Sequence, residues 1–123
     1  MSGPLPEPEV VTPTSRPVWI ALLAGPSLWW GHFMAVYLLA EVVCEVGAAG
    51  PAWLGLTAFG WAVVAATAGA LVATGVAARR TWTYRPEVEP SIDVLLLVGI
   101  GLDGLFALAI IATAAPVLWL RPC

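Results

Sequence analysis

Three long apolar runs constrain this 123-residue chain more than any other feature. They cover residues 18–40, 52–78 and 94–120. An α-helix rises about 1.5 Å per residue, so about 20 apolar residues cross a hydrocarbon core about 30 Å thick. Each run is long enough for one crossing. The sequence therefore predicts an all-α integral membrane protein, folded as a bundle of three transmembrane helices in a lipid bilayer.

The charged residues support this interpretation because they separate the runs. Charged side chains make up 11% of the sequence, and the mean hydropathy is +0.90. A soluble domain carries about 25% charged residues. Asp103 is the only charged residue inside a run, and His32 is the only histidine. No amphipathic or polar segment remains that could cover these runs as the core of a soluble protein.

The segments around the runs set the expected boundaries. We expect a disordered, Pro-rich cytoplasmic tail over residues 1–17, because small, acidic and proline residues cannot bury enough surface to fold. Residues 18–123 form the transmembrane domain, with spans at about 18–46, 52–79 and 92–120. The tail is acidic and the first run is longer than the roughly 7–15 residues of a signal peptide, so we expect this span to be retained.

Proline and glycine mark the connections and one interruption. Residues 47–51 are short and lack charge, which predicts a tight hairpin between the first two spans. Residues 79–91 contain two prolines and five of the 13 charged residues, which predicts a polar, extended linker. Gly25 and Pro26 interrupt the first span, so we expect a kink there, or a helix that begins near Pro26.

Arginine placement predicts the orientation. Four arginines fall on one side of the expected membrane, namely Arg16, Arg79, Arg80 and Arg85, and Arg121 falls on the other. Arginine and lysine are enriched in cytoplasmic loops, so the four-arginine side should be cytoplasmic. Aromatic residues occur near both expected interfaces, as in other membrane proteins. We expect a multi-pass protein of the bacterial plasma (inner) membrane, with its N-terminus cytoplasmic and its C-terminus outside.

Composition also excludes several classes of function. The net charge is −3 and the chain has no lysine, which argues against nucleic-acid or polybasic lipid binding. The sequence has no glycine-rich phosphate loop, no paired-cysteine metal motif and no nucleophile elbow. We therefore predict no enzymatic activity, no catalytic residues and no dedicated metal-ligating residues.

Small residues in the second run predict how the helices pack. They recur at three- and four-residue spacing, at Ala58, Ala62, Ala65, Gly69, Ala73 and Ala77, a set called the α-stripe below. Lipid does not drive helices together, so close backbone approach along such a stripe supplies the attraction. The sequence predicts that the second span is the central packing element. In the third run, three glycines near Asp103 would also let a neighbouring helix come close.

His32 and Asp103 are the candidate cofactor-binding residues. Polar ionisable groups inside a span are costly and usually face a protein interior. His32 lies about 21 Å of helix rise beyond Val18, and Asp103 about 17 Å beyond Ile92, so the two could meet at similar depth. Such a pair could hold haem or copper, or relay a proton. Alternatively, each satisfies a packing or partner contact only.

Two further sets of residues lie near the expected outer face. Glu41, Cys44 and Glu45 share one helix face with i, i+3, i+4 spacing, which suits either a metal or, more commonly, a solvated helix end. Both cysteines of the chain, Cys44 and Cys123, are expected on this oxidising side. We predict a Cys44–Cys123 disulfide; two free thiols and a copper site are the alternatives.

Several of these residues carry a family resemblance. The sequence of Gly25, Pro26, Trp29, His32, Tyr37 and Cys44, followed by two apolar spans and a terminal Arg121, Pro122, Cys123, resembles uncharacterised small three-span bacterial membrane proteins. Those proteins are found beside cytochrome c oxidase and its copper-assembly factor. The resemblance covers residues 18–123 and implies a respiratory-chain membrane context.

The expected function is non-enzymatic. Glycine- and alanine-rich helix faces favour an accessory, structural or assembly-type subunit of a larger membrane complex, and the resemblance implies a haem-copper oxidase. One alternative is a haem- or copper-binding or proton-conducting element that uses His32 and Asp103. Another is a small transporter formed by self-association, because three helices are few for enclosing a pathway.

Overall fold

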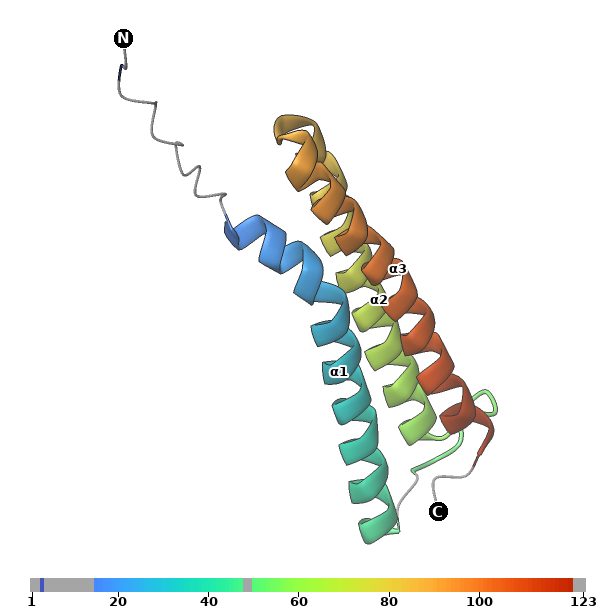
Figure 1. The fold of residues 1–123 in the computed structure, drawn as a ribbon. Helices are drawn as coiled ribbons and strands as arrows, with labels where there is room; N and C mark the ends of the chain where they lie inside the picture. The colour runs from blue at the N-terminus through green and yellow to red at the C-terminus, as the bar shows by residue number, and fades with distance from the viewer. Residues whose placement is uncertain (1–2, 4–14, 48–49, 121–123) are drawn as a thin grey trace.

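The computed structural model describes residue 3, residues 15–47 and residues 50–120. Three helices make up almost all of this part: α1 (Ser15–Val46), α2 (Ala58–Tyr84) and α3 (Pro90–Trp119). They lie side by side, with α1 and α3 running in the same direction and α2 opposite to both (Figure 1). Each is long and apolar enough to cross a membrane. The predicted all-α, three-span architecture is confirmed at this level.

The helix ends differ from those expected. The first helix begins at Ser15, so the last residues of the predicted tail are helical, and the rest of that tail, except residue 3, lies outside the described residues. The second helix begins at Ala58, where Thr57 accepts a hydrogen bond from the Gly60 N–H at 3.3 Å. An N-cap threonine satisfies one of the free N–H groups of a first turn. The helix therefore begins six residues after residue 52, where the second span was expected to start.

The residues before α2 form a turn of their own. Trp53 and Leu56 exchange two backbone hydrogen bonds, at 2.8 and 3.1 Å. Between them, Leu54 and Gly55 have φ values of 50° and 82°. A left-handed pair of this kind reverses the chain, and it is why the apolar residues at the start of the second run do not extend the helix.

The connection between α2 and α3 is compact. The helix α2 continues to Tyr84, and one turn of 3₁₀-helix, η1 (Arg85–Glu87), follows it directly. Pro90 then opens α3. Proline suits a first helical position because its missing N–H has no partner there in any case. The extended linker expected over residues 79–91 is therefore wrong, and a tight helical hairpin takes its place.

The first helix bends as expected. Pro26 lies inside α1, and the first turns of that helix run at an angle to the remainder (Figure 1). Proline removes the N–H that would bond to the carbonyl of Leu22 and crowds that carbonyl. Of the two possibilities at Gly25 and Pro26, the kink is confirmed, and α1 continues through it.

The two parallel helices pack in a constant register. The buried residues of α1 are Ala21, Gly25, His32 and Val36, and those of α3 include Gly99, Asp103, Ile110 and Ala114. Both sets are spaced by four, seven and four residues. A Cβ added at Gly99 would lie 2.8 Å from the Ala21 carbonyl oxygen, and one at Gly25 would lie 2.9 Å from Asp103 Oδ1. We call this contact the α1–α3 seam.

Candidate functional site

The buried polar side chains of the bundle form two layers, each contributed by more than one helix. The first layer contains His32, which is 5% exposed, and Thr67 of α2. His32 Nε2 lies 3.0 Å from Thr67 Oγ1, and the Thr67 hydroxyl donates to the Val63 carbonyl at 2.7 Å. A hydroxyl has one proton. Thr67 therefore accepts from His32 Nε2–H, which leaves Nδ1 buried without a partner.

The second layer contains Asp103, which is 1% exposed. Its carboxyl lies against the Gly25 backbone, yet neither oxygen meets a donor in good hydrogen-bond geometry. Thr74 of α2 is 2% exposed and donates its hydroxyl proton to the Ala70 carbonyl at 2.8 Å. Thr74 lies seven residues after Thr67 on α2, and Gly25 lies seven residues before His32 on α1. The antiparallel helix α2 thus places Thr74 level with Gly25 and Asp103.

The two layers do not join. We expected His32 and Asp103 to lie at similar depth, but the seam places His32 level with Ile110, seven residues beyond Asp103. Seven residues correspond to about 10 Å of helix rise. Counting depth from the ends of the apolar runs failed because α1 and α3 are aligned by the contacts of Gly25 and Gly99, and those contacts set the register.

The threonines of α2 were not singled out from the sequence. Thr67, Thr74 and Thr81 recur every seven residues, and each donates to the carbonyl four residues before it. A threonine that bonds within its own helix can still accept a hydrogen bond from a neighbour. Hydroxyls repeated at this spacing on one face of an apolar span are the signal that would have predicted the two layers.

A cofactor role for His32 and Asp103 stays a prediction. The atom that His32 could offer to haem iron or copper is Nδ1, because Nε2 is bound to Thr67. Asp103 lies in the other layer and cannot orient that ring directly. In the part of the chain that the structure describes, no three or more His, Cys, Asp or Glu side chains are grouped as a metal site would require.

The residues near the other end of α1 are exposed or half-buried. Glu41 and Glu45 are exposed, and Cys44 is half-buried. Cys44 is not a free thiol. Cys123 lies outside the described residues, so the Cys44–Cys123 disulfide stays a prediction.

Most of the α-stripe faces away from the rest of the bundle. Ala58, Ala62, Ala65 and Gly69 are exposed, while Ala73 and Ala77 are half-buried. A Cβ added at Gly69 would meet nothing within 4 Å. The helix α2 instead buries Phe59, Gly60, Val63 and Thr74. At its first four positions, therefore, the α-stripe does not form the contact expected of it, and larger side chains and a threonine of α2 face the neighbouring helices instead.

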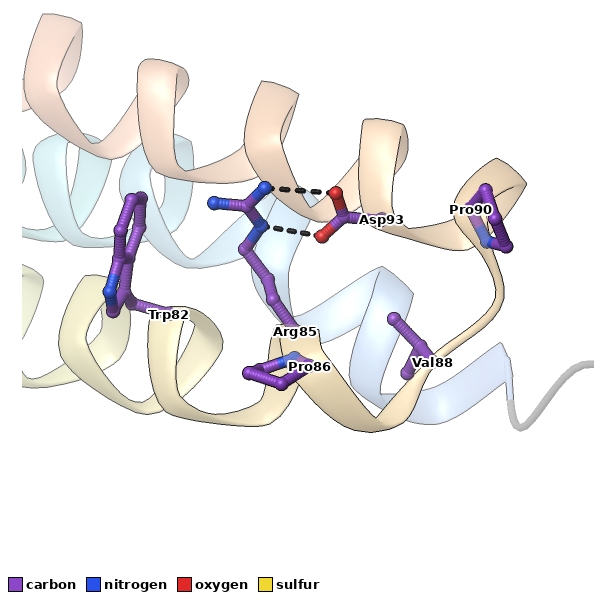
Figure 2. Close-up of a pocket in the computed structure, with 6 residues that line it drawn as sticks. All are labelled: Trp82, Arg85, Pro86, Val88, Pro90 and Asp93. Carbon is purple, nitrogen blue, oxygen red and sulfur yellow. Dashed lines mark hydrogen bonds and ion pairs between the residues drawn. The ribbon is translucent and has the colours of Figure 1, made fainter.

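An ion pair holds the α2–α3 connection. Arg85 donates through Nε and Nη2 to the two carboxyl oxygens of Asp93, at 2.5 and 2.8 Å (Figure 2). Its guanidinium carbon also lies 4.7 Å from the centre of the Trp82 ring. These three residues line a cavity of about 430 Å³ together with Pro86, Val88 and Pro90. The polar groups of this cavity are thus already paired with one another, which favours a structural role.

Comparison with known proteins adds no family to this description. No protein-family model, no curated protein and no solved structure matches the chain.

Proposed function

We propose that this chain is a non-enzymatic accessory or assembly-type subunit that packs laterally against a larger complex within a bacterial plasma membrane. The observation that carries the proposal is the outward direction of the α-stripe. Small residues let helix backbones approach closely, and in a membrane such approach is a main source of helix association. The bundle leaves this surface of α2 unused, so a helix of another protein can pack there.

The packing of the described residues is consistent with a binding subunit. The three-helix core is small. In the part of the chain described, its buried apolar side chains are Ala21, Val36, Phe59, Val63, Leu96, Ile110 and Ala114. Many large apolar side chains are exposed on all three helices. Lipid covers such side chains. Exposed glycine and alanine offer lipid little contact area, but they allow the backbone of another helix to approach closely.

A respiratory complex is the partner that we propose, specifically a haem-copper oxidase. Its support is the resemblance of residues 18–123 to small three-span proteins found beside cytochrome c oxidase. We further propose that the cytoplasmic side is the end of the bundle that carries Arg16, Arg79, Arg80 and Arg85, because cytoplasmic loops are enriched in arginine.

Co-purification tests the proposal directly. The full-length, tagged chain is purified in mild detergent from membranes that contain the oxidase, and the subunits recovered are identified and quantified by native mass spectrometry. We expect oxidase subunits in a fixed ratio to the chain. In Gly69→Leu and Ala65→Leu we expect at least a tenfold loss of the complex, since a loss of about 1.4 kcal/mol in association is tenfold.

A matched variant separates the α-stripe from a general effect of added bulk. Ala35 is exposed on α1, so Ala35→Leu makes the same kind of change on another outward surface. We expect this variant to retain the complex. Recovery of the wild-type chain only as a monomer, or only as a ring of its own copies, would contradict the proposal. A haem absorption band or stoichiometric copper in the isolated chain, lost in His32→Ala, would favour the cofactor-binding alternative.

A further inference from the structure

The Asp103 layer encloses a carboxyl group that no described residue of the bundle neutralises. The side chain is 1% exposed, and both of its oxygens are buried without a partner in good geometry. It lies in the apolar middle of α3, with the Gly25 backbone of α1 against it. An ionised carboxylate in such surroundings is strongly disfavoured unless it is paired.

The groups that face Asp103 from each helix show which partner is available. On α1 the facing residue is Gly25, and the only histidine, His32, lies in the other layer. On α2 the residue at this level is Thr74, and Arg79 and Arg80 are exposed beyond it. On α3 the other acidic residue, Asp93, is bound by Arg85. None of the described residues supplies a cation to this layer.

Two oxygen atoms at the level of this layer can act as acceptors, although neither makes a hydrogen bond to the Asp103 carboxyl in the structure. Thr74 has donated its only hydroxyl proton to the Ala70 carbonyl, so its oxygen can only accept. Pro26 has no N–H, which frees the carbonyl of Leu22 from its helical hydrogen bond at the level of Gly25. Both groups suit a neutral carboxylic acid and repel a carboxylate. The His32 layer follows the same pattern, in which a ring N–H donates to a threonine that has already donated.

We propose that Asp103 is a proton-binding site in the membrane interior, and that the bound proton holds the α1–α3 seam closed. At neutral pH the carboxyl carries the proton as a neutral acid. Loss of the proton places a negative charge against the Gly25 backbone, in a layer to which none of the described residues supplies a cation. Repulsion and the need for hydration then favour separation of α1 from α3. A sodium or potassium ion is disfavoured as the occupant, since one carboxyl, one hydroxyl and one carbonyl are few ligands for it.

Isotope labelling makes the test specific. The chain contains only two aspartates, Asp93 and Asp103. Asp93→Asn protein labelled with ¹³C-aspartate therefore has a single labelled side-chain carboxyl, and Asp103 itself is unchanged. Infrared spectra of this protein in vesicles, at neutral pH, distinguish the carbonyl stretch of a protonated acid from the two stretches of a carboxylate. We expect the protonated band, with slow deuterium shift because the group is enclosed.

Stability measurements test the link between the proton and the seam. Thermal unfolding of the wild-type chain and of Asp103→Asn is followed across a pH series. The amide resembles the neutral acid, so we expect equal stability at low pH and a wild-type midpoint that falls relative to the variant as pH rises. The other carboxyls are common to both proteins and cancel. A carboxylate spectrum at neutral pH would overturn the proposal, as would a stability difference that does not change with pH or that vanishes on adding sodium ions.

Discussion

The α1–α3 seam and the α-stripe are built from the same residue types but serve different contacts. At Gly25 and Gly99 a Cβ atom would come within 3 Å of the neighbouring helix, whereas at Gly69 of the α-stripe it would meet nothing within 4 Å. Small residues show where a helix can be approached closely, not which helix approaches. In this bundle the approach comes from a helix far away in the sequence.

The difference follows from the polar side chains rather than from the small ones. His32, Thr67, Thr74 and Asp103 must be turned inward, because an unpaired polar group facing lipid is costly. Once these four face the centre, the rotation of each helix is set. On α2 this rotation directs the α-stripe outward.

Glycine substitution in the seam should have the largest effect on stability. Gly99→Ala places a Cβ 2.8 Å from the Ala21 carbonyl oxygen, and Gly25→Ala places one 2.9 Å from Asp103 Oδ1. Overpacking of this kind costs about 1–3 kcal/mol. We expect each variant to lower the free energy of unfolding by that amount, measured by thermal or denaturant unfolding in mild detergent.

The control for this comparison is Gly104→Ala on the same helix. No atom lies within 4 Å of a Cβ at Gly104. Alanine is favoured over glycine within a helix by about 0.5–1 kcal/mol, so this variant should be as stable as the wild type or slightly more stable. Equal losses in all three variants would show that glycine itself, rather than close helix contact, determines stability at these positions.

The hydrogen bond between His32 and Thr67 should have the next largest effect. Thr67→Val keeps the shape of the side chain but removes the acceptor for His32 Nε2–H. Hydrogen bonds between membrane helices contribute about 0.6 kcal/mol on average and about 1.7 at most. We expect a loss within that range.

A double-mutant cycle with His32→Leu isolates the pair. If the bond stabilises the bundle, Thr67→Val should cost less when His32 is already absent. Additive losses would contradict a direct interaction between the two side chains.

The sequence predicted the helices well and their mutual register poorly. Three helices follow from hydropathy, because each apolar run is long enough to cross a bilayer as a helix. The kink at Pro26 follows equally from the chemistry of one residue. By contrast, the separation of His32 from Asp103 depends on the contacts Gly25 makes across the seam, and such contacts between distant segments leave no local pattern.

The connection between α2 and α3 was also predicted poorly from the sequence. Prolines and charges in residues 79–91 indicated an extended linker, but Pro90 starts α3 and Arg85 pairs with Asp93. A proline that breaks a helix and a proline that begins one look alike in the sequence. The threonines of α2 carried a readable signal, namely their seven-residue spacing, and they complete the two polar layers.

Loss of the Arg85–Asp93 pair should lower stability less than the glycine substitutions in the seam or the loss of the His32–Thr67 hydrogen bond. Both side chains are partly exposed, at 21% and 33%, so water screens their attraction. Arg85→Gln removes the charge, whereas Arg85→Lys keeps the charge but loses the paired geometry. We expect a slight fall in the unfolding midpoint for both, greater at low salt than at high salt. An effect independent of salt would indicate that Trp82 packing, not the ion pair, fixes this connection.

Changes in the α-stripe should have the smallest effect of all on the isolated chain. Ala65 is exposed and its side chain is not part of the bundle core, so Ala65→Leu should leave the unfolding free energy within about 0.5 kcal/mol of the wild type. The same variant is expected to lose the proposed partner complex. A seam variant such as Gly99→Ala should show the opposite pattern. Its free energy of unfolding should fall, and it should lose the partner complex only to the extent that the chain unfolds. If Ala65→Leu destabilised the isolated chain as much as Gly99→Ala does, α2 would have to be rotated from its described position. The distinction between an inward seam and an outward stripe would then fail.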